Sequence, residues 1–146
     1  MSATNTLETG LLELILQNVD TNAAISALGD GLQAATTAGS IYVALFTADP
    51  TDAGTQTNEC AYGAYARVAV ARSSGGWAVS GDTGDNVAAV TFPEATSGTE
   101  TATHFGLMSA SSAGEMFFHG ALDSGLAIST NVQPEFAIGV LDITAD

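Results

Sequence analysis

SIYVALF, residues 40–46, is the stretch at which the hydrophobic pattern of this sequence becomes that of a β-strand. Successive side chains of a strand point to opposite faces, so the apolar residues here divide into two sets. These sets are Ile41, Val43 and Leu45 on one face, and Tyr42, Ala44 and Phe46 on the other. Because both faces are apolar, the pattern predicts a central strand that is covered on both sides. The segment ADPTDAGT, residues 48–55, brings Pro, Asp and Gly together in the manner of a turn and ends the strand.

More β-forming runs follow towards the C-terminus. We expect strands at about 62–72, 76–80, 87–92, 101–108, 115–122, 126–130 and 136–144. The segments between them are rich in Gly, Ser and Asp, as in SSGG, GDTGD and DSG. Short strands at regular spacing indicate a mainly β fold, either an antiparallel β-sandwich or a jelly-roll-like barrel.

An amphipathic helix is predicted ahead of the first strand, over residues 6–19. Asn5 can cap its first turn, with Glu8 reaching back to the backbone as in a capping box. The apolar stripe of this helix recurs at helical spacing and consists of Leu7, Leu11, Leu14 and Ile15. Such a stripe must be buried, either on the chain's own sandwich or on a neighbouring molecule.

The length of 146 residues fits one compact domain. Within it we distinguish residues 1–39, the N-terminal helix with a connecting segment, from the β-sandwich of residues 40–146. Between the helix and the sandwich, the helical spacing is interrupted by Gly29 and Gly31. A short broken helix and a loop fit residues 20–39 equally well.

The charge balance is extreme, with 16 acidic residues against two arginines, no lysine, and a formal net charge of −14. Nucleic-acid affinity comes largely from Lys and Arg, so binding to nucleic acid is not expected, nor is binding to anionic membranes. The apolar run LLELIL is interrupted by Glu13 and is preceded by no Lys or Arg. We therefore expect it to be neither a signal peptide nor a transmembrane helix. Cys60 is the only cysteine and has no partner for an intramolecular disulfide.

Motifs of catalytic chemistry are not found in this sequence. It has no GxSxG, no HExxH and no phosphate-binding loop with its lysine. The closest carboxylate pairs, Asp49 with Asp52 and Asp82 with Asp85, lie in turn-like segments, where Asp bonds the following backbone. We therefore expect no enzyme, no catalytic residue, no cofactor and no bound metal.

Three side chains are candidates for contacts with a partner or another subunit: Arg67, Arg72 and Trp77. With acid in such excess, each arginine is expected to meet at least one carboxylate. A salt bridge that fixes a loop or a subunit contact is the favoured role, and recognition of a partner or an anion is the alternative. For Trp77, a core position is favoured over an interface anchor.

Several longer strings carry a resemblance to a known family. They are IYVALFTADPTDAGT, GAYARVAV, NVAAVTFPEAT, THFGLMSASSAGEMFFHGAL and FAIGVLDITAD, which cover most of residues 41–146. In these strings the chain resembles small tailed-phage virion proteins of the tail-fibre-like or capsid decoration type. The family also begins with a helix, whereas this chain carries a longer segment at about residues 20–39.

The resemblance implies a virion structural protein, made in the host cytoplasm. As a capsid decoration or cement protein it would bind the assembled lattice of the major capsid protein, as a homotrimer, and stabilise the shell by mass action. The alternative is a tail or fibre-associated structural protein that contacts other tail proteins. A second alternative is a carbohydrate-binding β-sandwich module, which would present exposed aromatic side chains on one face.

The two histidines flank the turn segment SASSAG, residues 109–114. If the hairpin is centred between Ser111 and Ser112, His104 lies opposite His119 as a structural cross-strand pair. A structural zinc site usually takes four protein ligands, and no further histidine or cysteine lies nearby in the sequence. We therefore expect hydrogen bonds to neighbouring hydroxyl groups such as that of Thr103.

Overall fold

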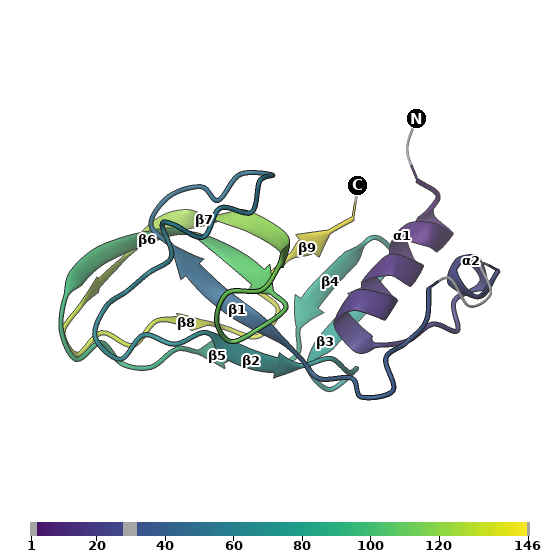
Figure 1. Ribbon diagram of the computed structural model, residues 1–146, viewed down its shortest axis with the longest axis horizontal. Helices are drawn as coiled ribbons and strands as arrows, with labels where there is room; N and C mark the ends of the chain where they lie inside the picture. The colour runs from purple at the N-terminus through teal and green to yellow at the C-terminus, as the bar shows by residue number, and fades with distance from the viewer. Residues whose placement is uncertain (1–2, 28–31, 146) are drawn as a thin grey trace. The chain divides into compact units, whose positions relative to one another are not determined.

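The computed structural model describes residues 3–27 and 32–145, and Figure 1 shows its course. The mainly β fold with a short N-terminal helix is confirmed, and its antiparallel sheets are consistent with a β-sandwich. The helical elements are α1 (Asn5–Leu12), the π-helical turn η1 (Glu13–Gln17) and α2 (Ala23–Ser26). The strands are β1 (Ser40–Phe46), β2 (Val68–Ala71), β3 (Trp77–Ser80), β4 (Thr83–Asn86), β5 (Val90–Thr91), β6 (Thr99–Met108), β7 (Met116–Ser129), β8 (Glu135–Phe136) and β9 (Ile143–Thr144).

The strands form three sheets, with the orders β2-β1-β6-β7, β3-β4-β9 and β5-β8. The chain divides into two compact units. The helix-bearing unit comprises Met1–Ser40, Val70–Ala89 and Ala137–Asp146, and the core-sheet unit comprises Ile41–Ala69 and Val90–Phe136. The predicted organisation, residues 1–39 and 40–146 within one compact domain, stays a prediction.

The core-sheet unit is built on β1, which lies between β2 and β6 as the predicted central strand. Its side chains from Val43 to Phe46 are fully buried, which agrees with the expectation that both faces are covered. Around it, aromatic rings form a continuous series of neighbours at centroid distances of 5.3–6.3 Å. The series runs Tyr62, Tyr65, Phe92, Phe136 and Phe105. Such ring pairs add about 0.5–1.5 kcal/mol each beyond the burial of their area.

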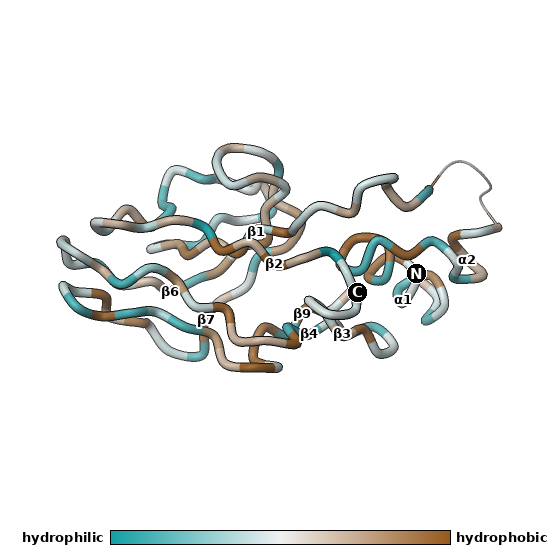
Figure 2. The backbone as a smooth tube through the Cα atoms, turned by 90° about the horizontal axis from the view of Figure 1, so that it is seen from below, coloured by the Kyte–Doolittle hydropathy of each residue, from teal (hydrophilic) through white to brown (hydrophobic). Residues whose placement is uncertain are grey.

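The helix-bearing unit begins with α1, which contacts β3 and β4 of the three-stranded sheet. The N-cap is Thr4, whose hydroxyl accepts a hydrogen bond from the backbone N–H of Leu7, so the predicted cap at Asn5 is wrong by one residue. Figure 2 shows hydrophobic and hydrophilic residues alternating along this helix. The last residue of α1, Leu12, is fully buried, and the helix contacts β3 and β4 of its own unit, so it packs within its own chain.

The apolar stripe of the helix differs from the predicted one. The most buried large side chains are Leu12, Leu14 and Leu16, whereas Leu7 and Leu11 are only half-buried. The change begins within α1, where Leu12 is buried in place of Leu11. It continues in η1, where Leu14 is buried as predicted and Leu16 is buried in place of Ile15, because a π-helical turn contains more residues than an α-helical turn.

Two predicted turns and one predicted strand are wrong for local reasons. The segment GDTGDN, residues 81–86, is mostly the strand β4, because Gly81 and Asp82 alone make the turn after β3. The predicted turn at residues 123–125 belongs to the long strand β7, at a place where its register with β6 shifts. The predicted strand 136–144 is interrupted between β8 and β9 by a turn at Gly139, whose φ is +68°.

Within residues 20–39, the described part before the gap contains the short helix α2, and residues 32–39, which lead to β1, are neither helix nor strand. Asn22 caps α2, since its side-chain oxygen accepts a hydrogen bond from Ala24 N at 3.0 Å. The predicted interruption at Gly29 and Gly31 lies outside the described residues.

Candidate functional site

The part of the chain that the structure describes contains no group of three His, Cys, Asp or Glu side chains arranged to hold a metal ion. It also contains no helix long and apolar enough to cross a membrane. The candidate functional features considered below are surfaces, together with the polar side chains that hold those surfaces in place.

Arg67 is the most completely bonded polar side chain of the core-sheet unit, and it is only 3% exposed. Its Nε and Nη2 bond the two carboxylate oxygens of Glu59 at 2.7 Å each, and Nη2 also donates to Gln56 at 3.0 Å. Nη1 donates to the carbonyl oxygens of Ala110 and Ala113 at 2.8 and 2.7 Å. All five donors of the guanidinium are thus used, and the favoured role of Arg67 as a salt bridge that fixes a loop agrees with these contacts.

A pocket of about 540 Å³ borders this arginine and is lined by residues from Gln56 to Arg67 and by the loop Ser111–Ala113. The Tyr65 hydroxyl, which also lines it, donates to Glu59 at 2.8 Å and accepts from Leu45 N at 3.1 Å. Burial raises the pKa of the Tyr65 phenol well above its usual range, and the hydrogen bond from Arg67 to Glu59 raises the pKa of the guanidinium. These polar groups are committed to one another, and the arginine has no donor left for a ligand.

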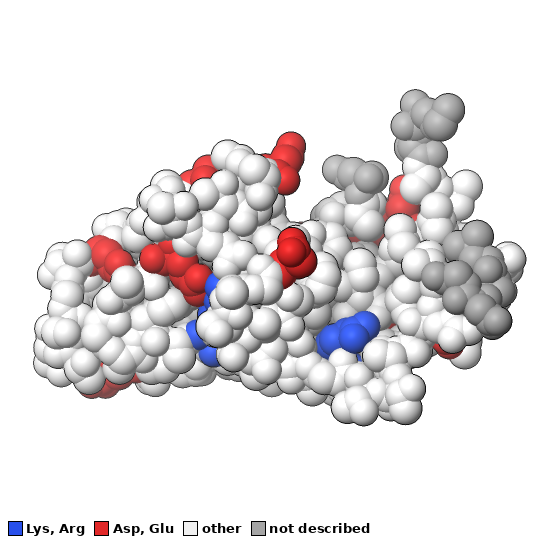
Figure 3. All heavy atoms as spheres, in the orientation of Figure 1, with Lys and Arg blue, Asp and Glu red and all other residues white. Residues whose placement is uncertain are grey.

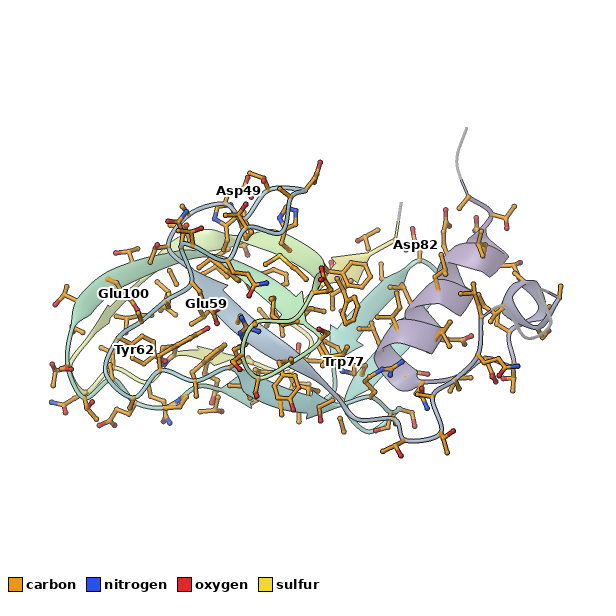
Figure 4. All side chains as sticks on the ribbon, in the orientation of Figure 1. Asp49, Glu59, Tyr62, Trp77, Asp82 and Glu100 are labelled. Carbon is orange, nitrogen blue, oxygen red and sulfur yellow. The ribbon has the colours of Figure 1, made fainter. Side chains whose placement is uncertain are left out.

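Glu100 and Tyr62 fix the neighbouring segment, and both are labelled in Figure 4 together with Glu59. The Glu100 carboxylate accepts hydrogen bonds from Ala61 N and Tyr62 N, each at 3.0 Å. The Tyr62 hydroxyl donates to Pro93 O at 3.0 Å. Burial raises the pKa of the Cys60 thiol to about 12, so this cysteine stays a protonated, unreactive core residue at neutral pH.

Arg72 serves the helix-bearing unit. It donates from Nε to Ile15 O, from Nη2 to Leu14 O and from Nη1 to Ala38 O, at 2.7, 2.7 and 3.1 Å. Two of these acceptors lie near the C-terminal end of the N-terminal helix, where a cation is favourable because carbonyl groups there lack helical partners. Among the described residues Arg72 meets no carboxylate, and backbone carbonyls take the place of the expected one.

Arg72→Ala should destabilise the protein by about 2 kcal/mol, because three carbonyl groups lose a charged donor and only part of that loss is restored by water. Thermal unfolding followed by far-UV circular dichroism measures it. Arg72→Lys is the matched control, since it keeps the positive charge but cannot reach all three acceptors, and its loss should be smaller. Wild-type stability in both variants would contradict the proposed role of these bonds.

Trp77 is fully buried, so its favoured role as a core residue holds. Its carbonyl accepts a hydrogen bond from the Gln17 side chain at 2.9 Å, which connects η1 to β3. Its indole Nε1 is buried without a hydrogen-bond partner. Figure 4 labels Trp77 beside the N-terminal helix.

The predicted cross-strand pair of His104 and His119 is wrong. His104 lies opposite Ala121, and His119 lies opposite Gly106. The residue opposite His104 is thus two positions further along β7 than His119. Because side chains of a strand alternate between the faces with a period of two, His119 and His104 still lie on the same face of the sheet, as diagonal neighbours. The expected bond to the Thr103 hydroxyl is confirmed, at 2.9 Å from His104 Nδ1.

The hairpin loop explains this displacement. The strand pairs next to the loop are Met108 with Met116 and Leu107 with Phe118. The pairing of Met108 with Met116 centres the loop on Ser112, whereas the predicted centre lies between Ser111 and Ser112. The second pair leaves Phe117 as an extra residue of β7, a β-bulge that moves the partners of Leu107 to His104 by one more position.

His119 instead lies between two carboxylates that the sequence did not connect with it. Its Nδ1 is 3.6 Å from Asp49 Oδ1, and its Nε2 is 3.5 Å from Asp52 Oδ1. Asp49 also accepts a hydrogen bond from Thr51 N at 2.8 Å, which is the turn role predicted for it. Because the carboxylates approach different ring nitrogens, they do not converge on one point as metal ligands would.

An apolar surface of the helix-bearing unit, which we call the Ile138 patch, consists of Val87–Ala89 and Ala137–Val140. Every residue of these two segments is exposed and nonpolar. Three of the five exposed large hydrophobic residues of the described chain belong to it: Ile138 at 68%, Val140 at 56% and Val87 at 39%. The sequence pattern was interpreted as strands at both places, although Gly139 within the second run is a signal of a turn.

Asn86 holds the two segments of the Ile138 patch together, and its side chain is buried. Nδ2 donates to Ala88 O and to Ala137 O, both at 2.8 Å. Oδ1 accepts from Val140 N at 3.1 Å and from Leu141 N at 3.0 Å. The side-chain amide has thereby satisfied two donors and two lone pairs, its full capacity. Sequence reasoning missed Asn86, because it placed this residue in a turn.

Exposed aromatic side chains, the feature expected of a carbohydrate-binding module, are represented by Phe117 alone among the described residues. It is 45% exposed at the bulge of β7. The other Phe, Tyr and Trp side chains of the described chain are buried or half-buried. A platform of several aromatic rings for stacking on a sugar is therefore not formed by the described residues.

Acidic groups are spread over the surface, as Figure 3 shows for one face. Because the net charge is −14, self-repulsion should weaken the folded state at low ionic strength. We expect the Tm to rise by roughly 4 °C between about 0.01 M and 0.2 M NaCl, a gain of about 1 kcal/mol, since the Debye length falls from about 30 Å to below 10 Å. Scanning calorimetry measures this, and a Tm unchanged over that range would show that the acidic surface has little effect on stability.

A protein-family model with the description "Podophage GP4 fiber I protein gp80" matches residues 2–144 of the chain. Comparison with curated proteins finds no significant match. The family match spans both compact units and almost the whole chain.

Proposed function

The chain belongs to the family of podophage GP4 fiber I protein gp80, and from this premise we propose that it is a non-enzymatic structural component of a podophage tail fibre. The observation that carries the proposal is the extent of the family match, residues 2–144. A phage virion protein of the tail-fibre-like type agrees with the resemblance found in the sequence. The proposed mechanism is contact between proteins, with no chemical step.

The geometry of the described residues supports a role in contacts. The polar side chains that a catalytic site would use are bonded within the chain, as in the network of Arg67, Glu59 and Tyr65. The exposed features are an acidic surface and the Ile138 patch. The partners that we propose are other virion proteins, and the proposed location is the virion.

The family description favours the tail or fibre over the capsid. The role as a decoration or cement protein on the major capsid protein was the principal expectation from the sequence, and the fibre was its alternative. We now propose the alternative as the function. The expected homotrimer is retained as part of this proposal, and native mass spectrometry at low and high salt tests it, with a trimer as the expected mass and a monomer or dimer as the contradicting result.

Immunogold electron microscopy of purified virions tests the location. An antibody against the recombinant chain should label the tail region, and the same antibody absorbed with the recombinant chain should label nothing. Labelling distributed over the capsid would contradict the fibre assignment in favour of decoration. If denatured virions do not contain the chain in mass spectrometry, the protein is not a virion component and the proposal is wrong.

A further inference from the structure

The Ile138 patch is unusual because it combines apolar character with turn geometry. Val140 N donates to Ala137 O at 3.3 Å, so Ile138 and Gly139 occupy the tip of a turn. Turn tips are normally polar, because Gly, Asn, Asp and Ser supply the conformations and hydrogen bonds that turns need. Here the tip presents an isoleucine that is 68% exposed. Exposed apolar patches on soluble proteins mark sites of interaction with other molecules.

The patch is also held rigidly. The side chain of Asn86 makes three hydrogen bonds to its two segments and a fourth to the adjoining Leu141 N, and the backbone carbonyl of Asn86 accepts a fifth from Gly139 N at 2.9 Å. A surface that is already ordered loses little conformational entropy on binding, so its apolar area is converted efficiently into affinity. The bonding around Asn86 thus prepares Ile138 and Val140 to enter a preformed apolar socket.

Charge determines which kind of protein can supply that socket. Asp142, next to the patch, is exposed, and the chain has no lysine. Arg67 uses all five guanidinium donors inside the chain, and Arg72 uses its guanidinium for three backbone carbonyls. A second copy therefore offers at most the two unused donors of Arg72 as a basic rim. It also adds a further charge of −14, which disfavours it as the partner of this patch. A basic surface is favoured, because opposite charges assist association.

We propose that the Ile138 patch is the docking surface for a different virion protein, one that has an apolar socket rimmed by Lys or Arg side chains. This inference rests on the proposed function as a virion component and adds the surface and the chemistry of the partner. Ile138 and Val140 fill the socket, and Asp142 meets its basic rim.

Site-specific photo-cross-linking in assembled virions tests this proposal. A photoreactive amino acid replaces Ile138 in the phage-encoded chain, and a matched control carries it at Phe117, which is exposed but belongs to the other unit. Irradiation of purified particles followed by peptide mass spectrometry should join position 138 to another virion protein, at a segment containing apolar residues and Lys or Arg. The control position should not reach that segment.

Each outcome decides something different. If the chain is absent from the particles, the proposed function fails, and the inference fails with it. If the chain is present but position 138 yields no product, joins a second copy, or joins an acidic segment, the proposed function stands and the inference is overturned.

A second test uses serine variants. Ile138→Ser combined with Val140→Ser should keep the Tm and lower the amount of chain in particles at least about tenfold, as expected for central interface residues. Phe117→Ser should leave the amount of chain in particles unchanged. Unchanged incorporation of the double variant would also overturn the inference.

Discussion

Arg67→Ala should destabilise the core-sheet unit by about 3–5 kcal/mol, which is the range for removing one partner of a buried ion pair. The substitution leaves the Glu59 carboxylate, whose side chain is 19% exposed, with only the Tyr65 hydroxyl as a side-chain donor. It also removes the donor to Ala110 O and Ala113 O, which holds the β6–β7 loop in place. Denaturation in urea followed by circular dichroism gives the total loss. Hydrogen exchange should show lost protection in residues 90–136 before residues 70–89.

Two control variants separate the charge from its geometry. Arg67→Lys keeps the charge but has no planar fork, so it should recover only part of the lost stability. Arg67→Met combined with Glu59→Leu removes both charges and should be less destabilising than Arg67→Ala alone, because no uncompensated carboxylate remains. A loss below about 1 kcal/mol for Arg67→Ala, the value of an exposed salt bridge, would contradict the structural role of the Arg67–Glu59 ion pair.

The parts of the fold that the sequence predicted correctly are those that depend on local pattern. The alternation in residues 40–46 predicted a central strand, because burial on both faces leaves a continuous apolar run. The mainly β class and the N-terminal helix follow from the same kind of periodicity. The excess of acid likewise predicted a carboxylate partner for Arg67, although the identity of Glu59 depends on the tertiary fold.

The errors arise where one residue changes the register or where distant segments meet. The bulge at Phe117 moves the partner of His104, and no property of that residue in the sequence distinguishes a bulge from regular pairing. The apolar stripe of the N-terminal helix likewise shifts by one residue, from Leu11 to Leu12 within α1 and from Ile15 to Leu16 in the π-helical turn η1. Asn86 was missed because its four bonds reach residues 88, 137, 140 and 141, and such contacts exist only after the C-terminal segment has folded onto β4.

Asn86→Ala should destabilise the helix-bearing unit by about 2–3 kcal/mol, since the buried Leu141 N loses its partner at a cost of about 1–3 kcal/mol and two part-buried carbonyl groups regain only part of their bonding from water. The groups affected are Ala88 O, Ala137 O and Leu141 N, and Leu141 itself is 1% exposed. Hydrogen exchange should show the largest increase at residues 137–141. A variant that keeps wild-type stability would contradict the role of Asn86 in ordering the Ile138 patch.

Asn86→Asp separates loss of contact from loss of donors, because the new side chain has nearly the same shape but, when ionised, only acceptors. Its second oxygen then faces Ala88 O and Ala137 O, which occupy the places opposite Nδ2 at 2.8 Å. Burial and these two carbonyl oxygens raise the pKa of the introduced carboxyl in the folded state above its unfolded value of about 3.9. A group whose folded pKa is raised stabilises the fold at low pH, and this stability is lost as the pH rises through the folded pKa.

Relative to Asn86→Ala, the Asp variant should therefore be less stable at about pH 7 and should recover towards about pH 4, where the protonated carboxyl can donate to one of the two carbonyls. Urea denaturation of both variants across this range measures the difference, and parallel pH profiles would show that the donors of Asn86 contribute nothing to the fold.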